Sequence, residues 1–389
     1  MKIISRTVLL LSFVSLFADV ASEMLYPVIP VYLKDIGFSV LLIGLLEGVA
    51  NFTAALSKGY FGKRSDESGL RLPFVKLGYF FSAVSKPMLA AFTFPLWIFF
   101  SRTVDRLGKG VRTAARDALL SQAATPQTKA RVFGFHRSMD TLGAAIGPAV
   151  TLLLLILYPK NYALIFLLAG IPGLLSVALV FALKEKRQPS STLAESGFFS
   201  FFGYWRIASP EYKKLVAGLV LLSLVNSSDV FLLLKTKEIV GDDRLVLGAY
   251  IFYNVVFALV SYPLGVLADR TNIRNVFLVG ILFFSLVYFL FAIARSITVI
   301  FVAFFLYGIY AAAVEGLAKA WITNLSHNRN TATAVGFFTS CESICTLLAS
   351  VLAGLLWQRF GSGPAFYTTA AVALLVVFYF LFGLRRPTK

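Results

Sequence analysis

The sequence predicts an all-α polytopic membrane protein with twelve transmembrane helices in two six-helix bundles. Three observations lead to this fold class. First, 58% of the 389 residues are hydrophobic and 14% are charged, whereas soluble domains carry about 25% charged residues. Second, the apolar residues form runs that can cross the hydrocarbon of a bilayer, which takes roughly 20 residues in a helix. Third, motifs of the first half of the chain recur in the second half.

Twelve apolar segments follow one another along the chain. The first six cover residues 7–33, 41–62, 72–92, 95–120, 132–157 and 162–183. The second six cover residues 213–236, 246–267, 276–294, 297–323, 331–358 and 363–384. The first segment is too long for a signal peptide and lacks a small-residue cleavage site, so we expect a retained helix.

One linker lies between the two sets of segments. It contains a Lys-Glu-Lys-Arg run, a Pro-Ser-Ser-Thr stretch and an aromatic patch at 198–205. We therefore expect an N-terminal six-helix bundle over 1–183, a cytoplasmic linker over 184–212 and a C-terminal six-helix bundle over 213–389. The aromatic patch is expected to lie along the membrane surface as a short amphipathic helix.

The loop charges predict the orientation of the chain. Most of the 36 Lys and Arg residues lie in short loops, mainly on the side of the N-terminus. The positive-inside rule therefore places both termini in the cytoplasm, which requires an even number of spans. The net charge of +17 is explained by these loops and not by nucleic-acid binding. The expected partners are a lipid bilayer and a small-molecule substrate, and the expected oligomeric state is a monomer.

Several kinds of chemistry find no support in the sequence. There is no G-x-x-x-x-G-K-[ST] motif, which excludes a P-loop pump. Cys341 and Cys345 lie one turn apart and suit packing better than a disulfide. With two histidines, His136 and His327, we expect no metal site and no cofactor. An enzyme would need a nucleophile and base inside the membrane, and a channel would need a filter motif, so neither is expected.

Segment 95–120 carries many ions on one side. At 100° per residue the charged side chains fall within an arc of about 140°. They are Arg102, Asp105, Arg106, Lys109, Arg112, Arg116 and Asp117. Each ion facing lipid would cost roughly 2.5–3.5 kcal/mol, so this face must point into protein or water. We expect Arg106 and Lys109, which lie deeper, to line a pathway. Arg112, Arg116 and Asp117 are expected to hold helices together near the inner surface.

Two further segments of the first bundle carry ions. Asp19 and Glu23 lie one turn apart, and a carboxylate in hydrocarbon is either paired or protonated. They are therefore candidates for reversible proton binding, and a permanent salt bridge is the alternative. His136 is either a relay or a satisfied buried residue. We expect the following residues to cluster near the midplane: Asp19, Glu23, Arg106, Lys109, Arg137 and Asp140.

The two halves of the chain repeat at an offset of 206 residues. This offset pairs Glu23 with Asp229 and Gly62-Lys63-Arg64 with the triplet that ends at Arg270. A duplicated six-helix unit is typical of a transporter whose site lies at the repeat interface.

Four motifs of the sequence resemble those of the major facilitator superfamily. Gly265-Val-Leu-Ala-Asp269-Arg270 resembles the loop motif G-x-L-A-D-R-x-G-R-K. In the first copy, read from Gly59 to Arg64, Lys63 stands where the family has its aspartate, and Asp66 is the nearest acid. Arg106-x-x-Lys109-Gly110-x-Arg112 resembles a second family motif, R-x-x-Q-G-x-G. Gly143, Gly147 and Pro148 match the G-x-x-x-G-P motif of the family's antiporters. The run 105–117 resembles that of efflux-like bacterial members.

The resemblance implies a secondary active transporter in the cell inner membrane that works by alternating access. We expect proton-coupled export of a small amphipathic or polar compound, with proton-symport uptake of a small solute or metal chelate as the alternative. The loop residues Gly59, Arg64, Asp66, Gly265, Asp269 and Arg270, with Arg112 and Arg116, are expected to take part in gating. Asp269 should meet a helix N-terminus or an arginine at the cytoplasmic helix ends. Gly143 and Gly147 permit close helix approach, for packing or for gating.

The second half contributes further intramembrane ions. Glu315 and Lys319 are spaced for an i,i+4 pair, whereas Asp229 and Glu342 have no local basic partner. Across the inferred membrane positions, nine acids face eight bases. This balance favours a zwitterion, or exchange of substrate for protons, over a plain anion.

Overall fold

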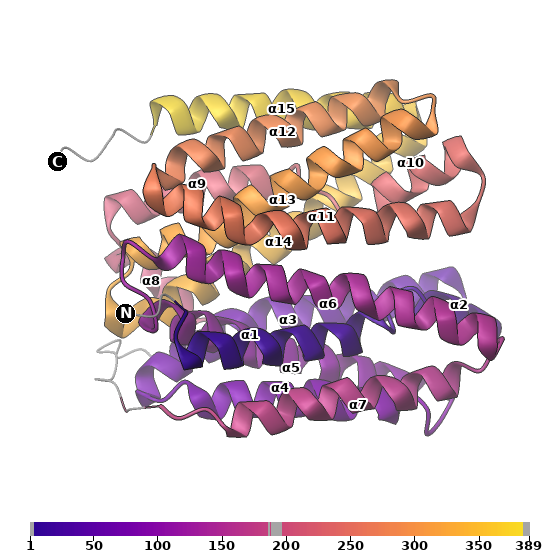
Figure 1. The fold of residues 1–389 in the computed structure, drawn as a ribbon, viewed down its shortest axis with the longest axis horizontal. Helices are drawn as coiled ribbons and strands as arrows, with labels where there is room; N and C mark the ends of the chain where they lie inside the picture. The colour runs from indigo at the N-terminus through magenta and orange to yellow at the C-terminus, as the bar shows by residue number, and fades with distance from the viewer. Residues whose placement is uncertain (1–3, 186, 188–196, 384–389) are drawn as a thin grey trace. The chain divides into compact units, whose positions relative to one another are not determined.

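The computed structural model describes residues 4–185, 187 and 197–383. In this part of the chain all regular structure is helical (Figure 1), which confirms the all-α fold. The Pro-Ser-Ser-Thr stretch of the linker lies outside the described residues. Seven of the helices are long and apolar enough to cross a membrane on these criteria alone: α6, α7 and α11 to α15.

The helices of the first half correspond to the first six predicted segments. Their bounds are α1 Arg6–Glu23, α2 Ile29–Asp35, α3 Val40–Ser68, α4 Leu72–Met88, α5 Pro95–Gln122, α6 Lys129–Leu157 and α7 Tyr162–Phe181. The first segment is broken into α1 and α2, and the break at 24–28 includes Pro27. Proline lacks an N–H and clashes with the preceding turn, which explains the interruption. Glu23 is the last residue of α1.

The helices of the second half follow the same plan. Their bounds are α9 Pro210–Ser223, α10 Val230–Val240, α11 Asp243–Arg270, α12 Ile273–Ile293, α13 Ile297–Leu325, α14 Thr331–Phe360 and α15 Ser362–Phe382, with the short turn η2 Asn328–Asn330 before α14. The seventh predicted segment is broken into α9 and α10. Asp229, the repeat partner of Glu23, is the N-cap residue of α10. Both carboxylates therefore stand where a predicted span is broken into two helices.

The linker aromatics form two short elements, η1 Ser200–Gly203 and α8 Tyr204–Ile207. Phe201 and Tyr204 are buried, whereas Phe199 and Ile207 are 60% and 55% exposed. The Phe201 ring lies against Gly59 of α3. The segment thus has apolar side chains both on its buried face and on its exposed face. Its position at the membrane surface stays a prediction.

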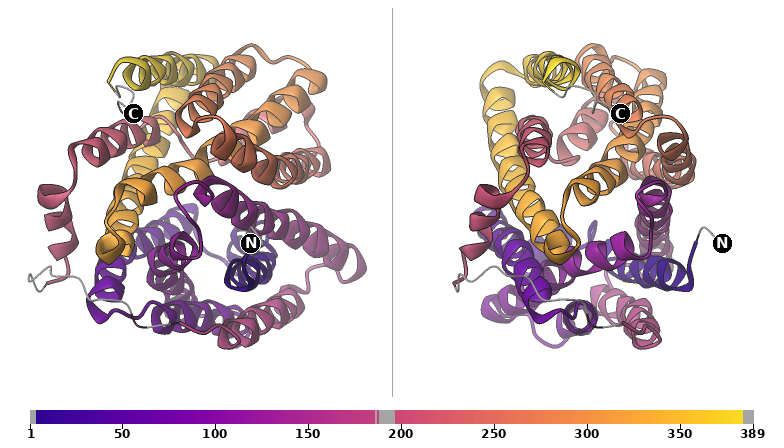
Figure 2. Two further views of the ribbon diagram at one scale, coloured as in Figure 1. Left: turned by 60° about the vertical axis from the view of Figure 1, so that its left-hand side comes forward. Right: turned by 90° about the vertical axis from the view of Figure 1, so that its left-hand side faces the viewer.

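The chain divides into two compact units. The first contains 1–125, 139–204 and 327–340, and the second contains 126–138, 205–326 and 341–389. The first ten residues of α6 therefore belong to the second unit, and the first ten residues of α14 belong to the first. Figure 2 shows the helices from two further sides. The division at the linker into 1–183, 184–212 and 213–389 stays a prediction.

Close helix packing positions the residues of the first unit. A Cβ at Gly143 would lie 2.5 Å from the Leu16 carbonyl oxygen, and one at Gly147 would lie 2.8 Å from the Met24 nitrogen. The glycines of the G-x-x-x-G-P motif therefore bring the backbone of α6 against α1. This contact places Asp140, one turn before Gly143, beside the ions of α1.

Candidate functional site

A charged cavity of about 170 Å³ lies within the first unit. Hydroxyl groups of Ser22, Tyr26 and Ser82 line it. Its charged lining residues are Glu23, Arg102, Asp105, Arg106, Lys109 and Arg112. Five of these six residues come from α5, so the charged face predicted for segment 95–120 points into the protein.

Ion pairs fix the guanidinium groups and carboxylates of this cavity. Glu47 of α3 accepts from Arg102, with 2.6 Å between Oε1 and the nearest guanidinium nitrogen, and lies 3.7 Å from Arg106. Lys86 of α4 lies 2.5 Å from Asp105. Glu47 and Lys86 are not among the site residues predicted from the sequence. The signal was present, because each is a charge inside a predicted span.

Lys109 and Arg112 of the cavity wall have surroundings unlike those of the ion-paired residues. Lys109 is exposed to the cavity, although α5 is packed between other helices. Arg112 is 3% exposed, donates to the Ser82 hydroxyl and lies 4.3 Å from the centre of the Tyr79 ring. Its charge is thus held by a hydroxyl and an aromatic face.

Asp19 and Asp140 form a carboxyl pair at one side of this cavity. Their side chains share a hydrogen bond. Two adjacent carboxylates repel each other when both are ionised, which favours one shared proton. Ser15 donates to Asp140, and Arg116 lies 3.9 Å from Asp140 and 3.0 Å from Asp117. The pair is therefore a candidate proton-binding group.

Of the six residues expected near the midplane, Arg137 has an ion-pair partner that was not predicted. Arg137 belongs to the second unit and pairs with Glu315 of α13. The expected partner of Glu315 was Lys319, one turn away on the same helix. A long-range pair of this kind depends on helix packing, and local spacing carries no signal for it.

Asp229 has tyrosine partners in the second unit. It accepts from the hydroxyls of Tyr307, at 2.6 Å, and Tyr253, at 3.3 Å. His136 is 4% exposed and Glu342 is half-buried. Among the described residues no group of histidine, cysteine and acidic side chains could hold a metal ion.

Asp269 joins the end of α11 to the start of α6 within the second unit. Its carboxylate accepts from the backbone N–H groups of Ala130, at 3.0 Å, and Arg131, at 3.1 Å. The Arg131 Nε donates to it at 2.6 Å. Asp269 therefore meets both a helix N-terminus and an arginine, where a negative charge is stabilised.

Asp66 makes the corresponding contact in the first unit. It accepts from the Thr333 backbone N–H and hydroxyl at 2.7 and 2.9 Å, near the start of α14. Arg71 donates to it at 2.7 Å. Gly69 ends α3 with a φ of 67°, which turns the chain so that Arg71 returns toward Asp66.

This geometry corrects the register of the first loop motif. A Cβ at Gly62 would lie 2.6 Å from the Ala332 carbonyl oxygen, and one at Gly265 would lie 2.5 Å from that of Ala130. The first copy thus begins at Gly62, not at Gly59. Its aspartate is Asp66, four residues on, as Asp269 follows Gly265. Lys63 and Arg64 instead pair with Glu67, at 3.5 and 3.2 Å, and Gly59 packs on Phe201.

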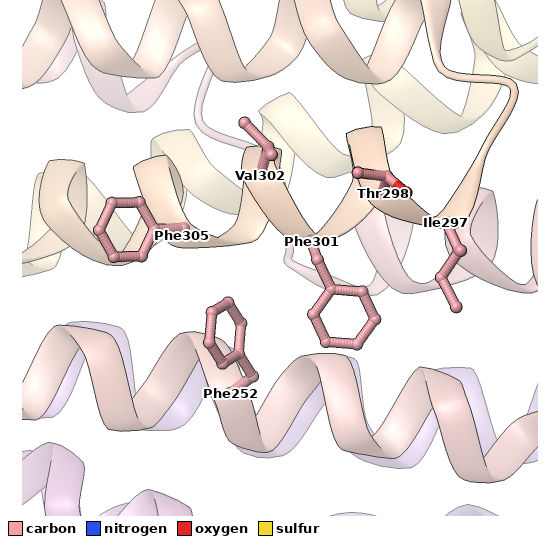
Figure 3. A pocket seen from close by; sticks show the side chains of 6 residues that line it. All are labelled: Phe252, Ile297, Thr298, Phe301, Val302 and Phe305. Atoms are coloured by element: carbon pink, nitrogen blue, oxygen red, sulfur yellow. The ribbon is translucent and has the colours of Figure 1, made fainter.

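A larger hollow, of about 500 Å³, lies between α11 and α13 in the second unit (Figure 3). Its lining is apolar apart from Thr298, and Val302 and Phe305 are 49% and 45% exposed. Without a charged or convergent polar group, this groove has no chemistry to offer a polar solute.

Comparisons with known proteins agree with this architecture. The family model described as Major Facilitator Superfamily matches residues 11–253 and 243–389, so the chain belongs to this family of membrane transporters. It is 32% identical to an uncharacterized MFS-type transporter of Methanocaldococcus jannaschii over 361 residues, 91% of this chain and 89% of that one. The quinolone resistance protein NorA of Staphylococcus aureus is 25% identical over 172 residues, 44% of this chain and 42% of NorA.

The fold is also that of solved transporter structures. The crystal structure of the human organic anion transporter TETRAN has a TM-score of 0.83 and 16% identity, with 96% of this chain and 99% of that chain covered. At this identity the likeness concerns the fold alone.

Proposed function

We propose that the protein is a secondary active transporter that exports a small amphipathic or polar compound in exchange for protons by alternating access. The observation that carries this proposal is the hydrogen-bonded pair of Asp19 and Asp140 next to the charged cavity. A proton held between two carboxyls can be released when the helices that carry them move apart. The pair joins α1 to α6, so such a movement couples protonation to conformation.

Two features favour export over uptake. The chain carries the antiporter-like G-x-x-x-G-P motif, and its glycines form the α1–α6 contact beside Asp140. A resistance protein, NorA, is among its partial relatives. We place the protein in the cell inner membrane as a monomer with cytoplasmic termini, driven by the proton gradient without a cofactor.

The Asp66 and Asp269 contacts support a gating device. Each joins the end of a helix from one repeat to the start of a helix from the other repeat. Alternating access requires such contacts to form and break once per cycle. We propose that both carboxylates favour the conformation that is closed to the cytoplasm.

Reconstituted vesicles test the proposal. A carrier shows trans-stimulated exchange of its substrate, whereas a channel does not. An imposed pH gradient, acidic outside a right-side-out vesicle, should drive substrate out. Uphill uptake under that gradient would instead establish proton symport, and conduction without trans-stimulation would refute the carrier.

A further inference from the structure

The cavity wall of the first unit carries more positive than negative charge. Four cationic and two acidic side chains line it. Glu47 and Lys86, which lie behind the wall and pair with its members, add one charge of each sign. With all of these groups ionised, the surplus is therefore two positive charges. Charges taken out of water need compensation by partners of opposite sign.

Three cations, Arg106, Lys109 and Arg112, carry this surplus, and Glu23 is the remaining acid of the wall. Asp105 is engaged by Lys86 at 2.5 Å, and Glu47 is engaged by Arg102 at 2.6 Å. Within the described part of the chain, neither Lys109 nor Arg112 forms an ion pair with a carboxylate at 4.0 Å or less. Arg112 instead donates to a hydroxyl and packs on a tyrosine ring.

The neighbouring carboxyl pair does not cancel this surplus. Asp19 attracts Lys109, and with one proton between Asp19 and Asp140 the two groups carry a single negative charge. Arg116 lies 3.9 Å from Asp140 but pairs with Asp117 at 3.0 Å, so the charge of the carboxyl pair lowers the surplus to one positive charge. The cavity thus keeps one positive charge in excess.

We propose that this cavity binds the carboxylate or phosphate group of a small organic anion. This inference deepens the proposed transport function and rests on it. Arginine presents a planar fork that matches both groups, and lysine adds a point charge. Ser22 and Tyr26 add two polar side chains to the wall. A volume of about 170 Å³ admits a compound of the size of a single substituted ring.

The positive surplus of this cavity differs from the nearly neutral membrane interior expected from the sequence. The count of nine acids and eight bases was taken over both bundles. Asp229 and the Arg137–Glu315 pair belong to the second unit and do not line the cavity. Charge balance over the whole chain therefore says little about the cavity itself.

The test uses ring compounds of equal size and different charge. The affinities of the purified full chain for phenyl phosphate, benzoate, benzamide and benzylamine are measured by calorimetry in detergent. We expect at least one of the two anions to bind about tenfold more tightly than benzamide, and benzylamine to bind least. Equal affinities for the four probes, or no binding of either anion, would overturn the inference.

Two substitutions of opposite sign separate recognition from folding. Lys109→Gln should weaken anion binding about tenfold, and Glu23→Gln should strengthen it. A merely structural effect would move both in one direction, which would overturn the inference. Lys214→Gln is the matched control, because Lys214 is an exposed lysine of α9 outside the cavity, and it should bind anions as the wild type does.

Binding in detergent requires no transport. A failed anion test therefore leaves the carrier proposal standing. Anion binding without trans-stimulated exchange would support the inference about the site while refuting the carrier.

Discussion

Replacing Asp269 by asparagine removes one charge from a contact that joins α11 to α6. The carboxylate accepts three hydrogen bonds, two from backbone N–H groups and one from the Arg131 guanidinium. Hydrogen bonds to charged groups contribute about 1.5–3 kcal/mol each. Asparagine keeps one acceptor oxygen, so we expect Asp269→Asn to destabilise the conformation with this contact by about 2–3 kcal/mol.

This energy predicts a large change in conformational populations. Since about 1.4 kcal/mol is a factor of ten, the population with the contact broken should rise about 30- to 150-fold. The assay is the labelling rate of a cysteine at Ala130, which is 2% exposed, by an impermeant maleimide. The native Cys341 and Cys345 are first replaced by serine.

The same variant separates gating from substrate recognition. Asp269→Asn should lower turnover while substrate affinity stays largely intact. The control is Glu211→Gln, which removes an exposed carboxylate from the first turn of α9 and should leave labelling and turnover unchanged. Unchanged labelling together with unchanged transport in Asp269→Asn would refute the gating role.

Three further predictions concern other contacts. Asp19→Asn and Asp140→Asn should each abolish transport driven by a pH gradient, while at least one keeps exchange at equal pH; full gradient-driven flux in both would make the pair structural. Asp66→Asn should impair turnover as Asp269→Asn does, and Lys63→Gln should not, which a comparison of initial transport rates decides; the reverse order would restore the register that starts at Gly59. Gly143→Ala should lower stability by about 1–3 kcal/mol, because its Cβ would lie 2.5 Å from a carbonyl oxygen of α1, and an unchanged thermal unfolding midpoint would show that α6 can shift freely.

Periodicity and composition sufficed to predict the twelve segments and the inward direction of the charged face of α5. Both depend on local sequence, because a helix is defined by its apolar length and an ion in lipid is costly. The repeat offset also predicted that Glu23 and Asp229 occupy related places. Both lie where a predicted span is broken into two helices.

The partners of the charged groups could not be predicted in this way. Lys86 with Asp105 and Arg137 with Glu315 are pairs between helices, set by rotation and depth of packing. The predicted register of the first loop motif was wrong for a related reason. The expected register matched an offset of 206, whereas the helix contacts of Gly62 and Asp66 correspond to those of Gly265 and Asp269 at an offset of 203.

The most direct test of the central claim is the sign of the proton movement that accompanies transport. Wild-type protein is reconstituted in vesicles that enclose a pH-sensitive dye, with equal pH on both sides, and phenyl phosphate is added outside. Exchange of substrate for protons predicts that the lumen becomes more alkaline as the compound enters, with no such change for Asp19→Asn or in empty vesicles. Entry of the compound without any change in lumenal pH would contradict proton coupling, and acidification would show that proton and substrate move together.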